Sequence, residues 1–173
     1  MPGVRPLAPA GPTTPETLYV DEDGPTEALP VEESQTIVVG TIASFQPYVS
    51  NDRAFIFTDV RVCVDEFLKV DGTPTPMLTF ERGGGVLLLP DGQRLVVSGV
   101  GAIRGTRVGR RYLLFLGRLF SAEAYSLLQA YDITDGRARA MERTGTASSV
   151  EGLRADALVE RVRTALRRIL RRG

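Results

Sequence analysis

Histidine is absent from the sequence, and cysteine occurs only once, as Cys63. Without histidine the chain cannot form a serine–histidine or cysteine–histidine catalytic pair, nor a histidine-ligated metal site. A single cysteine can make neither an intrachain disulfide nor, alone, a zinc or iron–sulfur site. The chemistry that remains rests on carboxylates, tyrosine, serine with lysine, or the backbone. We therefore predict that the protein is not an enzyme and that it holds no metal and no cofactor.

Long apolar runs are missing as well. The longest, residues 86–89 and 112–116, are far shorter than the roughly 20 residues that span a bilayer. Near the N-terminus Arg5 is not followed by an apolar stretch, because proline recurs at every third position from Pro6 to Pro15. The sequence therefore predicts a soluble chain with neither a transmembrane segment nor a secretory signal.

Charge is balanced overall but segregated along the chain, with 21 basic and 21 acidic residues. Residues 1–33 carry Arg5 and seven acids, which are Glu16, Asp21, Glu22, Asp23, Glu27, Glu32 and Glu33. No acid follows Glu160, and the residues after it include Arg161, Arg163, Arg167, Arg168, Arg171 and Arg172. Such asymmetry is typical of interaction segments. We take these six arginines as the candidate binding residues.

The first 33 residues also hold seven of the eleven prolines. They have almost no periodic apolar pattern, so they cannot bury enough surface to offset the entropy lost on ordering. The sequence therefore predicts three parts. These are an acidic, proline-rich disordered tail over 1–33, a β-barrel domain over 34–146, and a basic amphipathic helix over 147–173 that packs on the barrel.

Strand patterns begin immediately after the tail. Residues 36–45 are β-branched and apolar, with Gly40 as a bulge or a point of close approach. Residues 54–70 form a long strand with alternating polarity, and 77–80 a short one. The glycine triplet at 83–85 follows; we interpret it as a flexible connection in preference to a ligand-binding loop.

Two hairpins and a further strand complete the β pattern. One hairpin joins 86–89 to 94–98 around an Asp-Gly turn, and another joins 126–133 to 137–141 around a second such turn. Residues 110–117 form a strand with an apolar centre. Short strands separated by turns, with no helix between them, predict an antiparallel meander, sandwich or small barrel.

The last segment has helical periodicity. Ser148 and Glu151 have the spacing of a capping box, although Gly152 favours a start nearer Leu153. The apolar face comprises Leu158, Val159, Val162, Ala165, Leu166, Ile169 and Leu170. We expect this face to pack on the barrel while the arginines remain solvated. The alternatives are a partner groove, an anionic membrane surface or a nucleic-acid backbone.

Three stretches together resemble netrin-like modules. They are the apolar strand around Gly40, the segment V-R-V-C-V-D-E-F-L-K-V-D-G at 60–72, and G-R-R-Y-L-L-F-L at 109–116. The resemblance, which also extends to extracytoplasmic bacterial proteins, implies an OB-like five-stranded barrel. Netrin-like inhibitors of metalloproteinases act through a disulfide-held N-terminal cysteine, which Cys63 does not match, so their mechanism does not carry over. The resemblance favours an extracytoplasmic location with the signal already removed, and a cytoplasmic location stays open.

The sequence thus predicts a mainly β protein, a small antiparallel OB-like barrel or barrel-like sandwich with one C-terminal amphipathic helix. Its expected function is that of a non-catalytic binding or scaffolding module with a protein partner. One alternative is an OB-type binder of single-stranded nucleic acid. Aromatic and basic residues suited to that role are Phe55, Phe57 and Tyr112 beside Arg53, Arg61, Arg110 and Arg111. A carboxylate-dependent hydrolase is a further alternative, for which no carboxylate pair stands out.

Overall fold

The computed structural model describes residues 29–98, 106–118, 125–141 and 150–172. Within these ranges the chain forms seven strands followed by one helix. The elements are β1 (Thr36–Val49), β2 (Ile56–Lys69), β3 (Met77–Leu88), β4 (Arg94–Ser98), β5 (Arg111–Arg118), β6 (Tyr125–Asp132), β7 (Arg139–Ala140) and α1 (Ala155–Leu170). The predicted disordered tail lies almost wholly outside the described residues.

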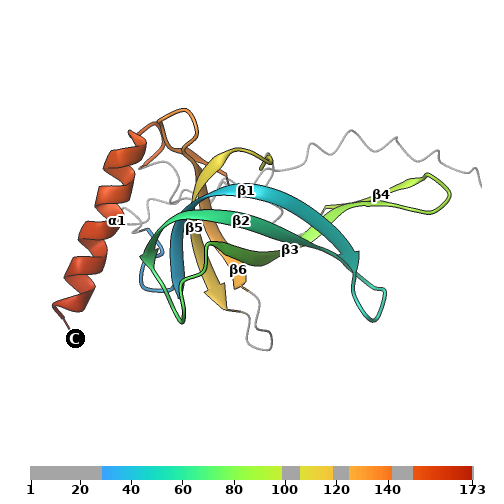
Figure 1. Cartoon of the computed structure of the whole chain (residues 1–173), viewed down its shortest axis with the longest axis horizontal. Coiled ribbons are helices and arrows are strands. Elements are labelled where there is room, and N and C mark those ends of the chain that lie inside the picture. Colours follow the sequence, from blue (N-terminus) through green and yellow to red (C-terminus); the bar gives the residue numbers. More distant parts are fainter. Residues whose placement is uncertain (1–28, 99–105, 119–124, 142–149, 173) are drawn as a thin grey trace, which may run out of the picture.

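Five of the strands close into a barrel in the order β1-β2-β3-β6-β5 (Figure 1). The first three form an antiparallel meander, β5 pairs with the other edge of β1, and β6 pairs with β5. A short parallel pairing of Phe80 with Tyr125 and of Glu81 with Ser126 joins β3 to β6. This arrangement is that of an OB-like barrel. The fold class predicted from the sequence, a small barrel with one C-terminal helix, is confirmed.

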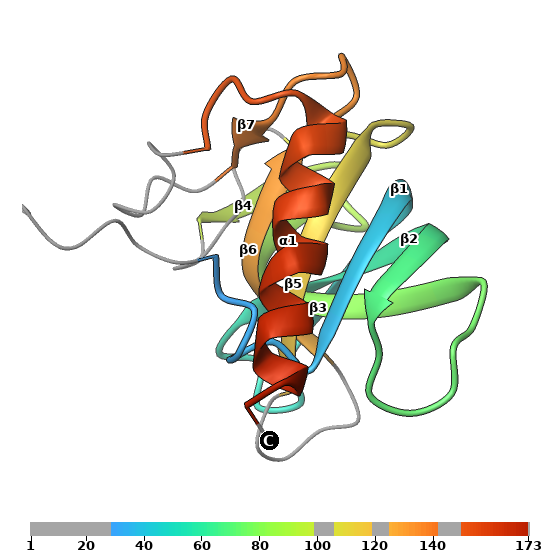
Figure 2. The same cartoon turned by 90° about the vertical axis from the view of Figure 1, so that its left-hand side faces the viewer.

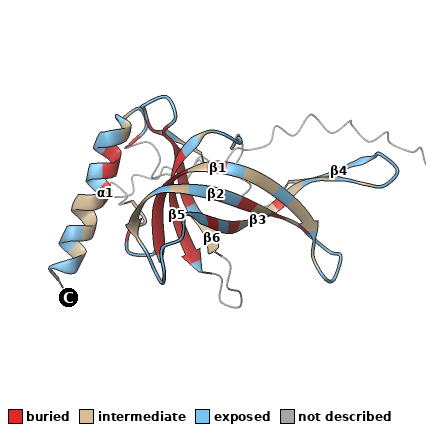
Figure 3. Ribbon diagram, in the orientation of Figure 1, coloured by how far each residue is buried: buried red, intermediate tan, exposed pale blue. Residues whose placement is uncertain are grey.

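The apolar side chains form two layers that share the strands between them. Inside the barrel lie buried residues such as Val62, Phe80 and Tyr112. On the outside of β1, β5 and β6 a second cluster, which includes Phe115, packs against α1 through Leu158. The centre of β5, residues 112–116, is apolar without alternation because its successive side chains enter these two clusters in turn. Figures 2 and 3 show α1 lying across the barrel strands, with the buried segments facing it.

Gly40 lies at a bulge and at a close approach of two strands, as its position in the sequence predicted. The pairing of β1 with β2 shifts register between Val39 and Gly40. A Cβ atom at Gly40 would lie 2.6 Å from the carbonyl oxygen of Cys63 and 2.7 Å from Cγ1 of Val62. The bulge and the close approach of the two backbones both require a residue without a side chain.

The prediction of a flexible connection at the glycine triplet, residues 83–85, is wrong. These residues are not a flexible connection between two strands, because β3 runs through them without interruption from Met77 to Leu88. Gly84 has a φ of 81°, and the Thr58 hydroxyl donates a hydrogen bond of 2.7 Å to its carbonyl oxygen. A Cβ atom at Gly85 would collide with that same hydroxyl group. The glycines therefore let β3 bend away from the barrel and continue as a strand.

The start of the helix also differs from the prediction. Helix α1 begins at Ala155, and its N-cap, Arg154, makes no side-chain capping hydrogen bond. Glu151 accepts a hydrogen bond of 2.8 Å from the Ala140 backbone N–H, and Ser148 lies outside the described residues. Gly152 has a φ of 78°, which belongs to a turn rather than a first helical turn. The predicted capping box therefore does not begin the helix. No helix among the described residues is long and apolar enough to cross a membrane.

Candidate functional site

The six arginines predicted as binding residues fall into two groups, those paired with carboxylates and those without an ion pair to a described residue. Arg163 forms an ion pair of 2.5 Å with Glu66 of β2, and Glu160 pairs with both Arg163 and Arg167. Hydrogen bonds from Arg167 and Arg163 lower the pKa of Glu160, and the hydrogen bond to Glu66 raises the pKa of Arg163. Two members of the predicted set are thus already neutralised by carboxylates.

The other four arginines are exposed and form no ion pair with any described residue; they are Arg161, Arg168, Arg171 and Arg172. Since a helix turns by roughly 100° per residue, Arg161 and Arg168 lie along one line of α1 (Ala155–Leu170). Arg163 points to the other side, where Glu66 lies. The line of arginines therefore borders the apolar face of α1 on the side away from β2.

The aromatic and basic residues considered for nucleic-acid binding do not form one surface. Tyr112 is fully buried, and its hydroxyl oxygen accepts a hydrogen bond of 3.0 Å from the Arg107 backbone N–H. Burial raises the pKa of Tyr112. Phe55 is 61% exposed, with its ring 6.4 Å from that of Phe57. The ring of Phe57 in turn lies 6.0 Å from that of Tyr48.

Arg110 and Arg111, the basic residues beside Tyr112, are engaged by carboxylates. Arg110 pairs with Asp132 at 2.6 Å and with Asp135 at 2.8 Å, and Arg111 pairs with Asp65 at 2.8 Å. Burial opposes ionisation of Asp132, but hydrogen bonds from Arg110 and from Thr134 outweigh it and lower its pKa. These arginines help to hold β5 against β6 and β2.

The outer face of β2 and β3 is acidic. Alternation with buried residues such as Val60 places Asp59, Arg61 and Asp65 outward on β2, and Glu81 lies beside Asp59 on β3. The hydroxyl of Tyr48 donates a hydrogen bond to Glu81, and burial together with this bond raises the pKa of Tyr48. In OB-like barrels this strand face is the usual site of oligonucleotides. Here the face has three carboxylates and one arginine.

The end of β3 and all of β4 form a two-stranded projection, which we call the β-arm (residues 84–98). It extends from the barrel on the side opposite α1 (Figure 1). Its cross-strand pairs are Gly84–Ser98, Gly85–Val97, Val86–Val96, Leu87–Leu95 and Leu88–Arg94. Val86, Leu88 and Val96 share one face and are 42%, 70% and 62% exposed. Leu95, on the other face, is 44% exposed, so the β-arm presents apolar side chains on both faces.

The β-arm also has a free backbone edge. The Leu89 N–H donates a hydrogen bond of 2.8 Å to the carbonyl oxygen of Gln93 at the end of the hairpin. In an antiparallel ladder the hydrogen-bonded pairs alternate, so Leu95 of β4 points its backbone groups toward β3. Arg94 and Val96 point theirs outward, where no described strand pairs with them. This edge can accept a further strand.

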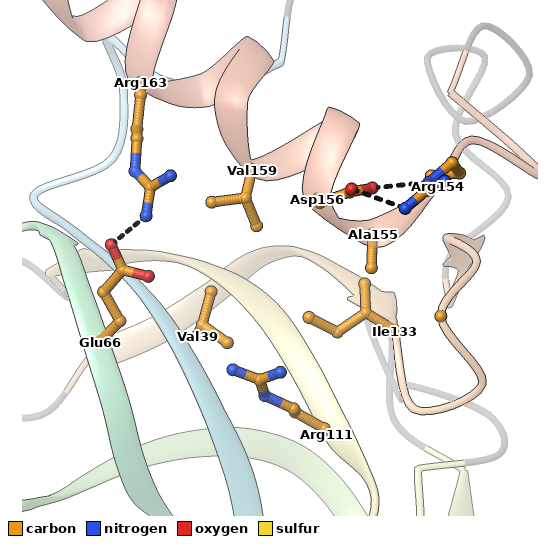
Figure 4. A pocket seen from close by; sticks show the side chains of 10 residues that line it. Val39, Glu66, Arg111, Ile133, Arg154, Ala155, Asp156, Val159 and Arg163 are labelled. Carbon is orange, nitrogen blue, oxygen red and sulfur yellow. Dashed lines mark hydrogen bonds and ion pairs between the residues drawn. The ribbon is translucent and has the colours of Figure 1, made fainter.

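A cleft of about 410 Å³ lies between the first turns of α1 and the barrel. Its lining residues are Val39, Glu66, Arg111, Ile133, Gly136, Arg154, Ala155, Asp156, Val159 and Arg163. Figure 4 shows Val39, Ile133 and Val159 at its centre, with charged residues around them. Within this rim, Arg163 pairs with Glu66 and Arg154 pairs with Asp156 at 2.9 Å. We call this site the helix cleft.

Sequence reasoning predicted the hairpin of residues 86–89 with 94–98, which the structure confirms, but it missed the exposure of this hairpin as the β-arm, and it missed the helix cleft. A usable signal for this exposure was present, because both strands of the hairpin have three consecutive apolar residues, at 86–88 and 95–97, without the polar alternation of a half-buried hairpin. The helix cleft had no such signal, since its lining comes from four strand or loop segments and α1. Among the described residues no group of three or more acidic or cysteine side chains is placed to hold a metal ion.

Comparison with protein-family models, with curated proteins and with solved structures found no match for this chain. The resemblance to netrin-like modules is therefore supported at the level of an OB-like barrel, by strand order and closure, and not at the level of that family.

Proposed function

We propose that this protein is a non-catalytic protein-binding module and that the β-arm is its recognition element. The single observation that carries the proposal is the exposure of large apolar side chains on a projecting hairpin. The β-arm holds four of the eleven large apolar residues that are exposed among the described residues: Val86, Leu88, Leu95 and Val96. Contiguous exposed apolar surface of this kind marks interaction sites in folded proteins.

The energetics of a hairpin support the same conclusion. A two-stranded ribbon is marginally stable in water unless another element covers it. Natural edge strands usually carry lysine, proline or inward charges that prevent pairing with other chains. Strand β4 has one charged residue, Arg94, followed by Leu95, Val96 and Val97. A partner that covers these residues would stabilise the ribbon and bury its apolar surface.

The partner expected from this geometry is an extended protein segment that adds a strand to β4. Its backbone would pair with the outward N–H and C=O groups of Arg94 and Val96. Alternate apolar side chains of the segment would then lie beside Val96 on one face, where Val86 of β3 is the next residue across the sheet, and beside Leu95 on the other. Backbone pairing supplies affinity in this mode of recognition, and the side-chain contacts supply specificity.

The two alternative functions have less support from the described residues. Binding of single-stranded nucleic acid calls for stacking aromatics beside basic residues. Here Tyr112 is buried, and the outer face of β2 and β3 is acidic. A glycosidase-type carboxylate pair would require two acids across a substrate cleft. Both acids that line the helix cleft, Glu66 and Asp156, are held by arginines.

The test is a selection of short random peptides, displayed on phage, against the full chain. We expect peptides with alternating apolar residues that bind with micromolar affinity and slow amide hydrogen exchange at Arg94 and Val96. Val96→Thr keeps the β-branched shape but adds a hydroxyl group. Val96→Pro removes the outward N–H, a change that edge strands tolerate. Both variants should weaken binding by about tenfold or more.

The matched control is Val108→Thr, because Val108 is 56% exposed and lies outside the β-arm. It should leave the affinity unchanged. Recovery of no peptide, or of peptides that bind the Val96→Pro variant as well as the original chain, would refute the proposal. Salt-sensitive binding of a fluorescent single-stranded oligonucleotide, measured by anisotropy, would instead support the nucleic-acid alternative.

A further inference from the structure

We propose that the helix cleft is a binding site for a small monoanion with an apolar body, a medium-chain carboxylate, and that Arg111 binds its carboxylate group. This inference is independent of the β-arm, which lies at the opposite end of the molecule (Figure 1). It rests on the apolar floor of the cleft, on the way the arginines of its rim are paired and on the unused hydrogen-bond donors of Arg111.

The floor of the cleft suits an apolar body. Val39 of β1, Ile133 after β6 and Val159 of α1 line it, and they belong to the buried cluster between the barrel and α1. The volume of about 410 Å³ falls within the range of roughly 300–1,000 Å³ that is common for small-molecule sites. An alkyl chain placed on these side chains would leave water without losing any hydrogen bond.

Each arginine in the rim of the cleft is paired with a carboxylate, but only two of these three carboxylates line the cleft. Three arginines and two carboxylates line it. Arg163 is neutralised by Glu66, and Arg154 by Asp156, both within the lining. The partner of Arg111 is Asp65, which is not part of the lining. Arg111 is thus the lining arginine whose carboxylate partner lies outside the cleft, so a ligand carboxylate can reach it from inside, whereas Glu66 and Asp156 would repel a second negative charge.

Arg111 has the donors needed to bind that charge. Only its Nε is engaged, in the 2.8 Å contact with Asp65, and its two terminal nitrogens have no hydrogen-bond partner among the described residues. Figure 4 shows its guanidinium group directed between Val39 and Ile133. The two terminal nitrogens of an arginine can bind both oxygens of one carboxylate, a geometry that lysine cannot reproduce.

The test is an NMR titration of the full chain with octanoate, followed through the methyl signals of Val39, Ile133 and Val159. We expect saturable shifts at these three residues. Octanol should bind about tenfold more weakly, because it lacks the charge, and acetate more weakly still, because it lacks the chain. In the Arg111→Gln variant the dissociation constant for octanoate should rise by about tenfold or more.

Two further variants separate the role of Arg111 from general effects of charge. Arg111→Lys keeps the charge but loses the paired donors, so its affinity should lie between that of the original chain and that of Arg111→Gln. Arg61→Gln removes an exposed arginine of β2 that does not line the cleft, and it should change nothing. Shifts that fail to saturate, or an affinity that Arg111→Gln leaves unchanged while the fold is intact, would overturn the inference.

Discussion

Replacement of Gly40 by alanine tests the closest backbone contact in the barrel. An alanine Cβ would lie 2.6 Å from the Cys63 carbonyl oxygen and 2.7 Å from Val62 Cγ1, both closer than the 3.0 Å below which real Cβ contacts essentially do not occur. The carbonyl oxygen belongs to the backbone of β2, which pairs with β1 over this region. Side-chain rotation cannot relieve the contact with that oxygen, so the two strands must separate locally.

Two opposing effects determine how much Gly40→Ala changes the free energy of unfolding. Overpacking in a well-packed core costs about 1–3 kcal/mol. Alanine also reduces the conformational entropy of the unfolded chain, which stabilises the protein by about 0.4–1 kcal/mol. We expect a net loss of roughly 1–2 kcal/mol in the free energy of unfolding. For a chain of this length, that loss corresponds to a decrease in Tm of about 2–8 °C.

Urea unfolding followed by circular dichroism and tyrosine fluorescence measures this loss, with Gly117→Ala as the matched control. A Cβ atom at Gly117 would meet the Leu128 side chain at 3.1 Å. Leu128 is 38% exposed and can move toward solvent, so this variant should differ from the original chain by less than about 0.5 kcal/mol. A Gly40→Ala variant as stable as the original chain, or less destabilised than Gly117→Ala, would refute the reasoning.

Two further predictions concern α1 and the buried carboxylate. Leu158→Ala removes a fully buried side chain at the contact of α1 with the barrel. We expect the free energy of unfolding, measured by urea titration, to fall by about 2–5 kcal/mol. A loss below about 1 kcal/mol would contradict the packing described here. Asp132→Asn should lower the urea midpoint at neutral pH. The pKa of Asp132 is lowered in the folded state, so its stabilising effect is present above its ordinary pKa of about 3.9 and is lost as the pH falls through the folded value. The difference between the two proteins should therefore shrink in strongly acidic buffer, and a constant difference at all pH values would contradict the assignment.

Local patterns were sufficient to predict the class of fold. The alternation around Val60 and Val62, the apolar centre of β5 and the Asp-Gly turns each report the environment of a few consecutive residues. These signals specified antiparallel strands and a C-terminal amphipathic helix, and the structure has both, although β3 is longer than the short strand predicted over 77–80. The bulge at Gly40 could also be anticipated, since a glycine within a β-branched strand already indicates a close approach.

Features that depend on distant residues could not be predicted in the same way. The glycine triplet within β3 has the composition of a flexible loop. It stays in a strand because Thr58 of β2 holds Gly84 and because β4 pairs with Gly84 and Gly85. The helix begins later than the capping box suggested, since the Glu151 carboxylate accepts a hydrogen bond from the backbone N–H of Ala140 in β7 and does not cap the helix.

The residue chemistry of the chain was determined by the sequence alone: no histidine, one cysteine, acids at one end and arginines at the other. Tertiary structure decided which of these charges remain free. Closure of the barrel and the packing of α1 brought Arg163 to Glu66, and they directed Arg111 into the helix cleft. Bending of β3 exposed Val86 and Leu88, apolar residues that a strand pattern would normally assign to the core. The physical reason is that burial and ion pairing depend on separations in space, which a linear pattern of residues does not contain.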